Sequence, residues 1–304
     1  MATSVQSYAA NPPAMSRLAR WVRKYWIAYL FIAVPVIWNI VFLLIPMLVS
    51  LWWSLNDYSG LKPPVFVGLQ NYIQLLTRDP IFIKSFVNTT EFVLLGMGIG
   101  PTLGLLTALM LNQNVKFQSV FRTAYFLPVM TSLVVVSTIW IMLYNQNGLF
   151  NVVIRALGLP RVGFLSNPQF ALLSVAAASI WQGFGFETVV FLAALQAIPK
   201  ELYEAAEIDG ANAYHKFLAV TLPALRPVIL FAYIVGIIGS YQVFDQVFVM
   251  TKGGPLYASS TIVYYLFTKF QDLRLGYASA IAYILFAVLV IFSYIQMRFF
   301  GEQQ

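Results

Sequence analysis

Six long stretches of hydrophobic residues alternate with polar connections along this chain of 304 residues. Each stretch reaches the ~20 residues that a helix needs to cross about 30 Å of hydrocarbon. The candidate spans are residues 26–53, 84–111, 119–144, 170–197, 224–250 and 276–300. The pattern therefore predicts an all-α, polytopic membrane protein whose six transmembrane helices form a bundle.

The polar connections predict further elements outside the spans. Residues 54–83 place apolar side chains at roughly helical spacing between 69 and 76, which predicts an amphipathic helix on the outer surface. Asp79-Pro80 predicts a break after that helix. Residues 145–169 are rich in turn-forming residues and predict an outer loop, and residues 256–275 predict an interfacial segment before the last span.

The second span repeats a small residue at every fourth position, and the stripe consists of Gly96, Gly100, Gly104 and Ala108. Small side chains on one face of a membrane helix let another helix approach closely. We therefore predict tight helix packing on this face, in preference to a pore-lining role.

Composition agrees with a membrane location, because 60% of the residues are hydrophobic and only 10% are charged, against about 25% charged residues in soluble domains. Part of the net charge of +7 comes from four basic residues just before the first span, Arg17, Arg20, Arg23 and Lys24. The positive-inside rule places such a cluster in the cytoplasm. We therefore predict a cytoplasmic N-terminal arm over residues 1–25, disordered over residues 1–16, and a transmembrane domain over residues 26–300. The first span is too long for a signal-peptide core, and six spans put both termini in the cytoplasm.

The residue inventory argues against several kinds of chemistry. The chain has no cysteine and a single histidine, His215, so we expect no metal site and no catalytic triad. It contains no Gly-Lys pair, and therefore no phosphate-binding loop of the P-loop type. We predict a chain without catalytic residues that draws its energy from elsewhere.

Polar side chains nevertheless occur within the fourth span. Ser179, Gln182 and Phe186 share one face of the predicted helix, and Glu187 follows them. A charge at mid-membrane costs about 2.5–3.5 kcal/mol on insertion scales, so Glu187 should face protein or water. Polar groups interleaved with aromatic rings suit a sugar, which offers hydroxyls at its edge and C–H surface on its face. The alternative is that these polar groups join helices by hydrogen bonds worth roughly 0.6–2 kcal/mol each.

The fifth span carries Ser240, Tyr241, Gln242 and Asp245, to which the same two interpretations apply. Asp245 lies near the outer end of its span. Reaching the membrane interface explains this acid as well as a substrate contact does.

A charged stretch, residues 198–223, separates the fourth and fifth spans. Its first helix carries acidic residues at the positive end of the helix dipole and ends at Gly210. A second short helix is expected over Ala213–Thr221, closed by Pro223. Because the stretch follows the fourth span, the predicted topology places it in the cytoplasm.

The charged stretch also carries a spaced motif. Glu204-Ala205-Ala206 is followed after three residues by Gly210, and after nine more by Val220-Thr221-Leu222-Pro223. This pattern resembles the EAA signature of permease subunits in binding-protein-dependent ABC importers. Val220 stands where the family usually has isoleucine, which is a conservative departure.

Other segments are similar to the carbohydrate-uptake branch of that family, namely residues 67–72, 121–128 and 251–255. The resemblance covers about residues 27–300. It implies the fold of a type I ABC importer permease, with a cytoplasmic coupling helix within residues 198–223.

The resemblance also implies a heteromeric complex in the cytoplasmic (inner) membrane of a bacterium or archaeon. The implied partners are a homologous but different permease subunit, two ATP-binding subunits that hold ATP and magnesium, and an extracytoplasmic solute-binding protein, with no contact to nucleic acid. The residues implied to dock on the ATPase are Glu204, Ala205, Ala206, Asp209, Gly210, Leu222 and Pro223.

The substrate path is carried over by the same resemblance. The family positions correspond to Ser179, Gln182, Gly183 and Phe186 in the fourth span and to Gly236, Gly239, Ser240 and Val243 in the fifth. The second group departs from the family, because it has lost most polar and aromatic side chains. Either the partner permease holds most of the substrate, or neighbours such as Tyr241 and Gln242 serve instead.

Two hypotheses of function follow. The first is a non-catalytic permease subunit of an ATP-driven importer, forming half of the path for a sugar or sugar-like solute. The alternative is an ion-coupled secondary transporter of a small polar solute, with Glu187 or Asp245 as the proton carrier. The sequence leaves open which solute is carried.

Overall fold

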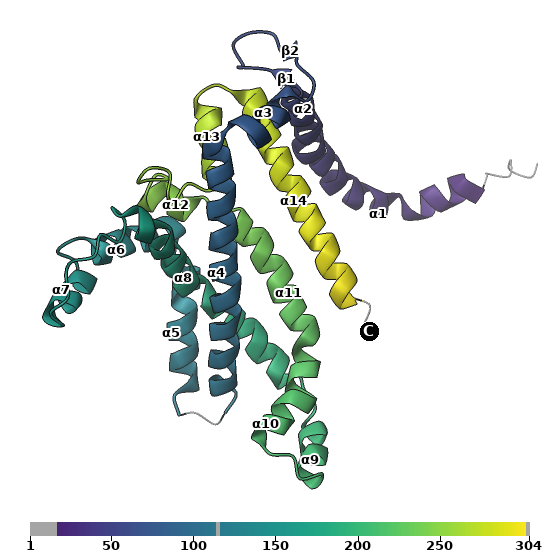
Figure 1. The fold of residues 1–304 in the computed structure, drawn as a ribbon. Coiled ribbons are helices and arrows are strands. Elements are labelled where there is room, and N and C mark those ends of the chain that lie inside the picture. The colour runs from purple at the N-terminus through teal and green to yellow at the C-terminus, as the bar shows by residue number, and fades with distance from the viewer. Residues whose placement is uncertain (1–16, 114–115, 302–304) are drawn as a thin grey trace, which may run out of the picture. The chain divides into compact units, whose positions relative to one another are not determined.

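The computed structural model describes residues 17–113 and 116–301, which are predominantly helical (Figure 1). The arm predicted over residues 1–16 lies outside the described residues. The chain divides into two units, one ending at Trp52 and one beginning at Trp53. Six helices among the described residues are long and apolar enough to cross a membrane, in agreement with the predicted number.

The first unit is a long interrupted helix. Helix α1 spans Arg17–Asn39, a π-helical turn spans Ile40–Leu44, and α2 spans Ile45–Ser54. The amide of Ile45 donates to the carbonyl of Ile40, five residues back. This wider turn immediately precedes Pro46, which has no amide hydrogen to give, so the π turn absorbs the proline within a continuous span. The described span runs from Lys24 to Ser54, close to the prediction.

A small hairpin and a short helix open the second unit. Strand β1 (Asn56–Asp57) pairs antiparallel with β2 (Val65–Phe66), and α3 follows over Gln70–Arg78. The side-chain amide of Asn71 donates to the carbonyls of Ser54 and Asn56, which fixes α3 against the hairpin. The amphipathic helix was predicted and is confirmed, whereas the hairpin was not predicted.

Two long helices form the centre of the second unit, α4 (Pro80–Leu111) and α8 (Pro168–Gln196). Both begin in the same way. The side chain of Asp79 accepts hydrogen bonds from the first-turn amides of α4, and that of Asn167 does so for α8, in each case with a proline at the first helical position. Proline is tolerated there because its missing donor would have no intrahelical partner.

The third and fifth predicted spans are broken in the structure. The third consists of α5 (Gln118–Met130) and α6 (Leu133–Tyr144), and the apolar stretch long enough to cross begins only at Leu133. Pro128 contributes no amide to the last turn of α5, and the chain becomes extended at Thr131. The prediction of one continuous helix over residues 119–144 was therefore wrong.

The fifth span breaks in a similar way, into α11 (Leu222–Tyr241) and α12 (Asp245–Met250). The predicted outer loop, residues 145–169, also contains a helix, α7 (Leu149–Ala156), which turn-forming residues around it had obscured.

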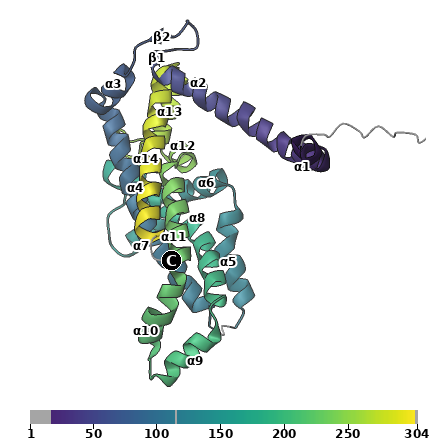
Figure 2. The same cartoon turned by 90° about the vertical axis from the view of Figure 1, so that its right-hand side faces the viewer.

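The last two helices are α13 (Ile262–Gln271) and α14 (Leu275–Gly301), which agree with the predicted interfacial segment and last span. Figures 1 and 2 both show α3 and α13 at one end of the second unit and α9 and α10 at the opposite end. The charged α9–α10 segment therefore lies at the end of the second unit opposite the end that carries α3 and α13.

Asp79 joins three helices at the end that carries α3 and α13. Its carboxylate accepts hydrogen bonds from the hydroxyls of Tyr265 (2.7 Å) and Tyr277 (2.6 Å) and from the amides of Ile81 and Phe82. Burial raises the pKa of Asp79, but the hydrogen bonds from Tyr277 and Tyr265 and from the two amides outweigh it, so the pKa lies below the ordinary carboxyl value.

Candidate functional site

The charged stretch folds as the predicted helix, turn and helix. Helix α9 spans Lys200–Ile208, and Gly210 follows it with a φ of 77°. The amide of Gly210 donates to Glu207 and that of Ala211 donates to Ala206, which closes the end of α9. No atom lies within 4 Å of the position that a Cβ on Gly210 would take. The backbone conformation, and not crowding, therefore requires glycine here.

The second part of the stretch differs from the prediction at its end. Helix α10 (Ala213–Lys216) passes through a π-helical turn (Phe217–Thr221) directly into α11. Pro223 does not close a helix, because it lies in the first turn of α11, where its missing amide costs nothing. The stretch is thus continuous with a membrane-spanning helix.

Two side-chain contacts hold α9 against the segment that follows it. The hydroxyls of Tyr203 and Thr221 are 2.9 Å apart, and Lys216 Nζ lies 3.0 Å from Glu207 Oε2. Lys216 and Glu207 are partly solvated, so that ion pair contributes at most about 1 kcal/mol. The Tyr203–Thr221 hydrogen bond joins α9 directly to the π turn at the base of α11.

The α9–α10 segment offers a mixed polar and apolar surface. Glu204, Ala205, Asp209 and Gly210 are exposed, and Ala206 is partly buried. Ile208 is 87% exposed and Tyr214 66% exposed, although both are large and apolar. Of the other predicted coupling residues, Leu222 is half-buried and Pro223 exposed at the start of α11.

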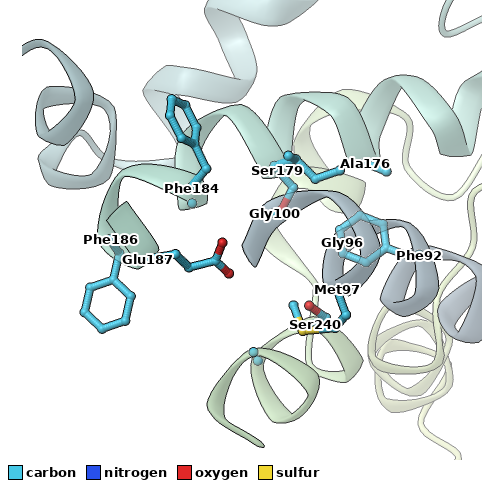
Figure 3. Close-up of a pocket in the computed structure, with 14 residues that line it drawn as sticks. Phe92, Gly96, Met97, Gly100, Ala176, Ser179, Phe184, Phe186, Glu187 and Ser240 are labelled. Atoms are coloured by element: carbon cyan, nitrogen blue, oxygen red, sulfur yellow. The ribbon is translucent and has the colours of Figure 1, made fainter. Parts of the chain in front are cut away.

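A cavity of about 240 Å³ lies between α4, α8 and α11. Four residues predicted for the substrate path line it, Ser179, Gly183 and Phe186 from α8 and Ser240 from α11. Gly236 and Gly239, which the resemblance also named, line it as well. Figure 3 shows the Glu187 carboxylate directed into the space between the helices, with the ring of Phe186 turned away.

Glu187 was not among the predicted path residues, although the structure places it in the cavity wall. Its Oε2 atom is buried and has no hydrogen-bond partner among the described residues. The sequence signal that pointed to Glu187 was the cost of placing a charge at mid-membrane. The position of Glu187 on α8 also explains why two residues of the small-residue stripe on α4 are glycines. A Cβ on Gly100 would lie 3.1 Å from Glu187 Oε2, and one on Gly104 would lie 2.7 Å from Glu187 Cβ. Close packing is therefore confirmed at Gly100 and Gly104, but Gly96 and Gly100 also line the cavity, a role that the prediction had not favoured.

The remaining predicted path residues lie elsewhere. Gln182 is buried and donates its amide to the carbonyl of Thr131, at the break between α5 and α6. Tyr241 is only 2% exposed and belongs to a hydrophobic cluster, while Gln242 and Asp245 are exposed where α11 ends. The structure thus brings half of the predicted set together at the cavity.

A bundle of membrane-spanning helices, with a mainly apolar cavity between them and a projecting charged segment at one end, is typical of a membrane transport protein. Residues 100–302 match the family of the "binding-protein-dependent transport system inner membrane component", and the chain belongs to this family. The resemblance seen in the sequence is confirmed.

Relatives of known name agree with the family. The trehalose/maltose transport system permease protein MalF of Thermococcus litoralis is 34% identical over 261 residues, which cover 85% of this chain and 88% of the relative. The lactose transport system permease protein LacF of Rhizobium radiobacter is 33% identical over 276 residues, covering 88% and 92%.

The fold also occurs in a solved structure of a bacterial alginate ABC transporter in complex with an alginate pentasaccharide-bound periplasmic protein. The two chains superimpose with a TM-score of 0.83 over 93% of this chain and 96% of the other, at 24% sequence identity. This likeness confirms the all-α permease fold.

Proposed function

We propose that this chain is one of two permease subunits of an ATP-driven importer and that it forms half of the path for a sugar or oligosaccharide. The observation that carries the proposal is the exposed α9–α10 segment. Its helix α9 presents Glu204 beside small residues and is followed by Gly210, whose positive φ allows the sharp turn.

In this proposal the chain itself performs no catalysis. It contains no Gly-Lys pair and therefore no P-loop, so ATP and magnesium are held by two partner subunits that dock on the α9–α10 segment. A second, homologous permease subunit completes the path, and an external solute-binding protein delivers the solute. The name of the family, and the periplasmic protein bound to the alginate transporter, support this arrangement.

The proposed orientation places both termini and the α9–α10 segment in the cytoplasm. The basic cluster ending at Lys24 precedes the first span, which the positive-inside rule assigns to the cytoplasm. The end with α3 and α13 then faces outward, where a solute-binding protein docks. The membrane is the cytoplasmic (inner) membrane of a prokaryotic cell.

A sugar is the proposed solute for two reasons. The relatives are named for trehalose, maltose and lactose transport. The cavity wall combines hydroxyl side chains, Ser179 and Ser240, with aromatic rings, Phe92 and Phe184. Hydroxyl groups and rings match the polar edge and the C–H face of a sugar.

The test is substrate-stimulated ATP hydrolysis and solute uptake by the assembled transporter carrying Glu204→Ala together with Gly210→Ala. We expect both activities to be lost while the chain still inserts in the membrane, because the docking surface loses the carboxylate of Glu204 and its turn is strained by the positive φ. Glu201→Ala, another exposed acid of α9, is the matched control and should leave both activities intact. Normal stimulated hydrolysis in the double variant would refute the coupling role.

The comparisons lend no support to the alternative, an ion-coupled transporter that works alone. Uptake by the purified chain in liposomes under a proton gradient, without ATP or other subunits, would restore that alternative. Dependence on added ATP and on an ATPase that co-purifies would exclude it.

A further inference from the structure

Glu187 gives the cavity an acidic side chain that the proposed path residues do not supply. It is the only ionisable side chain among the described residues that line the cavity. Its neighbours in the wall are glycines, hydroxyls, apolar side chains and aromatic rings, and neither of the two ion pairs found among the described residues includes it.

The backbone around Glu187 is built to hold it in this place. Gly100 and Gly104 of α4 leave room for its side chain, since a Cβ on either glycine would come within 3.1 Å of a Glu187 atom. Oε2 is buried and lacks a hydrogen-bond partner among the described residues, so the carboxylate is not joining helices. A buried acceptor aimed into a cavity without a partner is costly, and such groups are usually explained by a function.

An ionised carboxylate can only accept hydrogen bonds, and it repels anions. In a low-dielectric cleft this repulsion acts strongly, because such walls concentrate the field of a single charge. A neutral solute that is rich in hydroxyl groups can donate to Glu187, whereas a uronic acid or a phosphorylated sugar meets a like charge. No Lys or Arg among the described residues of the wall offsets this repulsion.

We propose that Glu187 determines the charge selectivity of the path: it accepts hydrogen bonds from the hydroxyls of an uncharged saccharide and excludes anionic ones. The assignment of a saccharide rests on the proposed function, while the charge selectivity of the cavity stands on the geometry.

The absence of cysteine from the chain makes a direct test available. Gly183 lies one helical turn before Glu187 in the same wall, and no atom lies within 4 Å of a Cβ placed on it. Gly183→Cys therefore introduces a single thiol about 6 Å from the Glu187 side chain. The reaction of this thiol with water-soluble reagents of opposite charge reports the charge of the cavity without requiring knowledge of the solute.

The assembled transporter carrying Gly183→Cys is treated with trimethylammonioethyl methanethiosulfonate or with sulfonatoethyl methanethiosulfonate, and the intact mass of this chain is followed over time. Relative to their rates on a small free thiol, we expect the cationic reagent to react about tenfold faster or more than the anionic one. Adding Glu187→Gln should bring the ratio close to that of the free thiol.

Adding Glu91→Gln is the matched control, because Glu91 is an exposed acid of α4 that does not line the cavity, and it should preserve the ratio. Equal corrected rates with Glu187 present, a ratio unchanged by Glu187→Gln, or no reaction with either reagent would overturn the proposal. ATP-dependent sugar uptake, measured on the assembled transporter without any substitution, reports the proposed function separately. Absence of that uptake, together with the expected ratio in the Gly183→Cys protein, would refute the sugar importer and leave the charge selectivity standing.

Discussion

Replacing Gly104 by alanine is the sharpest test of the packing that positions Glu187. Gly104 lies on the face of α4 that meets α8, and an added Cβ would lie 2.7 Å from Glu187 Cβ and 3.2 Å from the backbone carbon of Glu187 and the amide nitrogen of Thr188. Two of these three atoms belong to the backbone, so no side-chain rotation relieves the contact. The two helices must move apart.

The size of the effect follows from these distances. Carbon atoms prefer separations of about 3.5–4.0 Å, so the added Cβ is roughly 1 Å too close to Glu187. Overpacking of this kind costs about 1–3 kcal/mol. Against this, alanine is favoured over glycine in a helix by up to about 1 kcal/mol. We therefore expect Gly104→Ala to be about 1–3 kcal/mol less stable than an alanine substitution on the same helix without contacts.

Gly98→Ala provides that reference, since no atom lies within 4 Å of its Cβ position and it belongs to the same helix. Thermal unfolding of the two purified variants in detergent should place the melting temperature of Gly104→Ala several degrees below that of Gly98→Ala. The cavity beside Glu187 should also change shape, so solute-stimulated ATP hydrolysis should fall in Gly104→Ala alone. Equal melting temperatures would show that α4 and α8 are not in contact at Gly104.

Two further predictions concern single hydrogen-bonded side chains. Because its pKa is lowered in the fold, Asp79 stabilises the folded chain above the ordinary carboxyl pKa and loses this contribution as the pH falls through the lowered value. The melting temperature should therefore fall on acidification below about pH 4. Asp79→Asn should lower the melting temperature at neutral pH and flatten its dependence on acid. An unchanged profile of melting temperature against pH would contradict the stabilising role of the Asp79 carboxylate. Tyr203→Phe removes the hydrogen bond to Thr221, worth about 0.5–1.5 kcal/mol. This variant should reduce solute uptake per ATP hydrolysed, with little change in the amount of inserted protein. An unchanged ratio of uptake to hydrolysis would show that this hydrogen bond does not couple α9 to α11.

The sequence predicted the number and order of the spans because hydropathy depends on composition, which no tertiary contact alters. It predicted the α9 turn because Gly210 adopts a positive φ that other residues rarely take. It failed where a break is hidden within an apolar run. Pro128 lies in the last turn of α5, but apolar residues flank the break on both sides, so a hydropathy window passes over it.

The cavity was harder to predict than the spans, because a polar residue on a helix does not show which neighbour it meets. Gln182 and Ser179 are three residues apart on α8, yet Gln182 donates to the carbonyl of Thr131 at the break between α5 and α6, while Ser179 lines the cavity. The position of Tyr241 was likewise decided by where α11 ends, and the break that ends it was not predicted. A glycine stripe predicts a helix contact more reliably than a polar residue does, since few residues other than glycine allow two helices to approach so closely.

The connectivity explains how one segment can act on the cavity from a distance. The α9–α10 segment is inserted between α8 and α11, the two helices that carry Glu187 and Ser240 to the cavity wall. At 1.5 Å per residue, Glu187 lies about 14 Å from the end of α8, and Ser240 lies about 27 Å from the start of α11. Both helices are continuous over these lengths. In the proposed importer, a displacement of the segment would therefore be transmitted along α8 and α11 to both walls of the cavity, while Glu187 would select the solutes that occupy it.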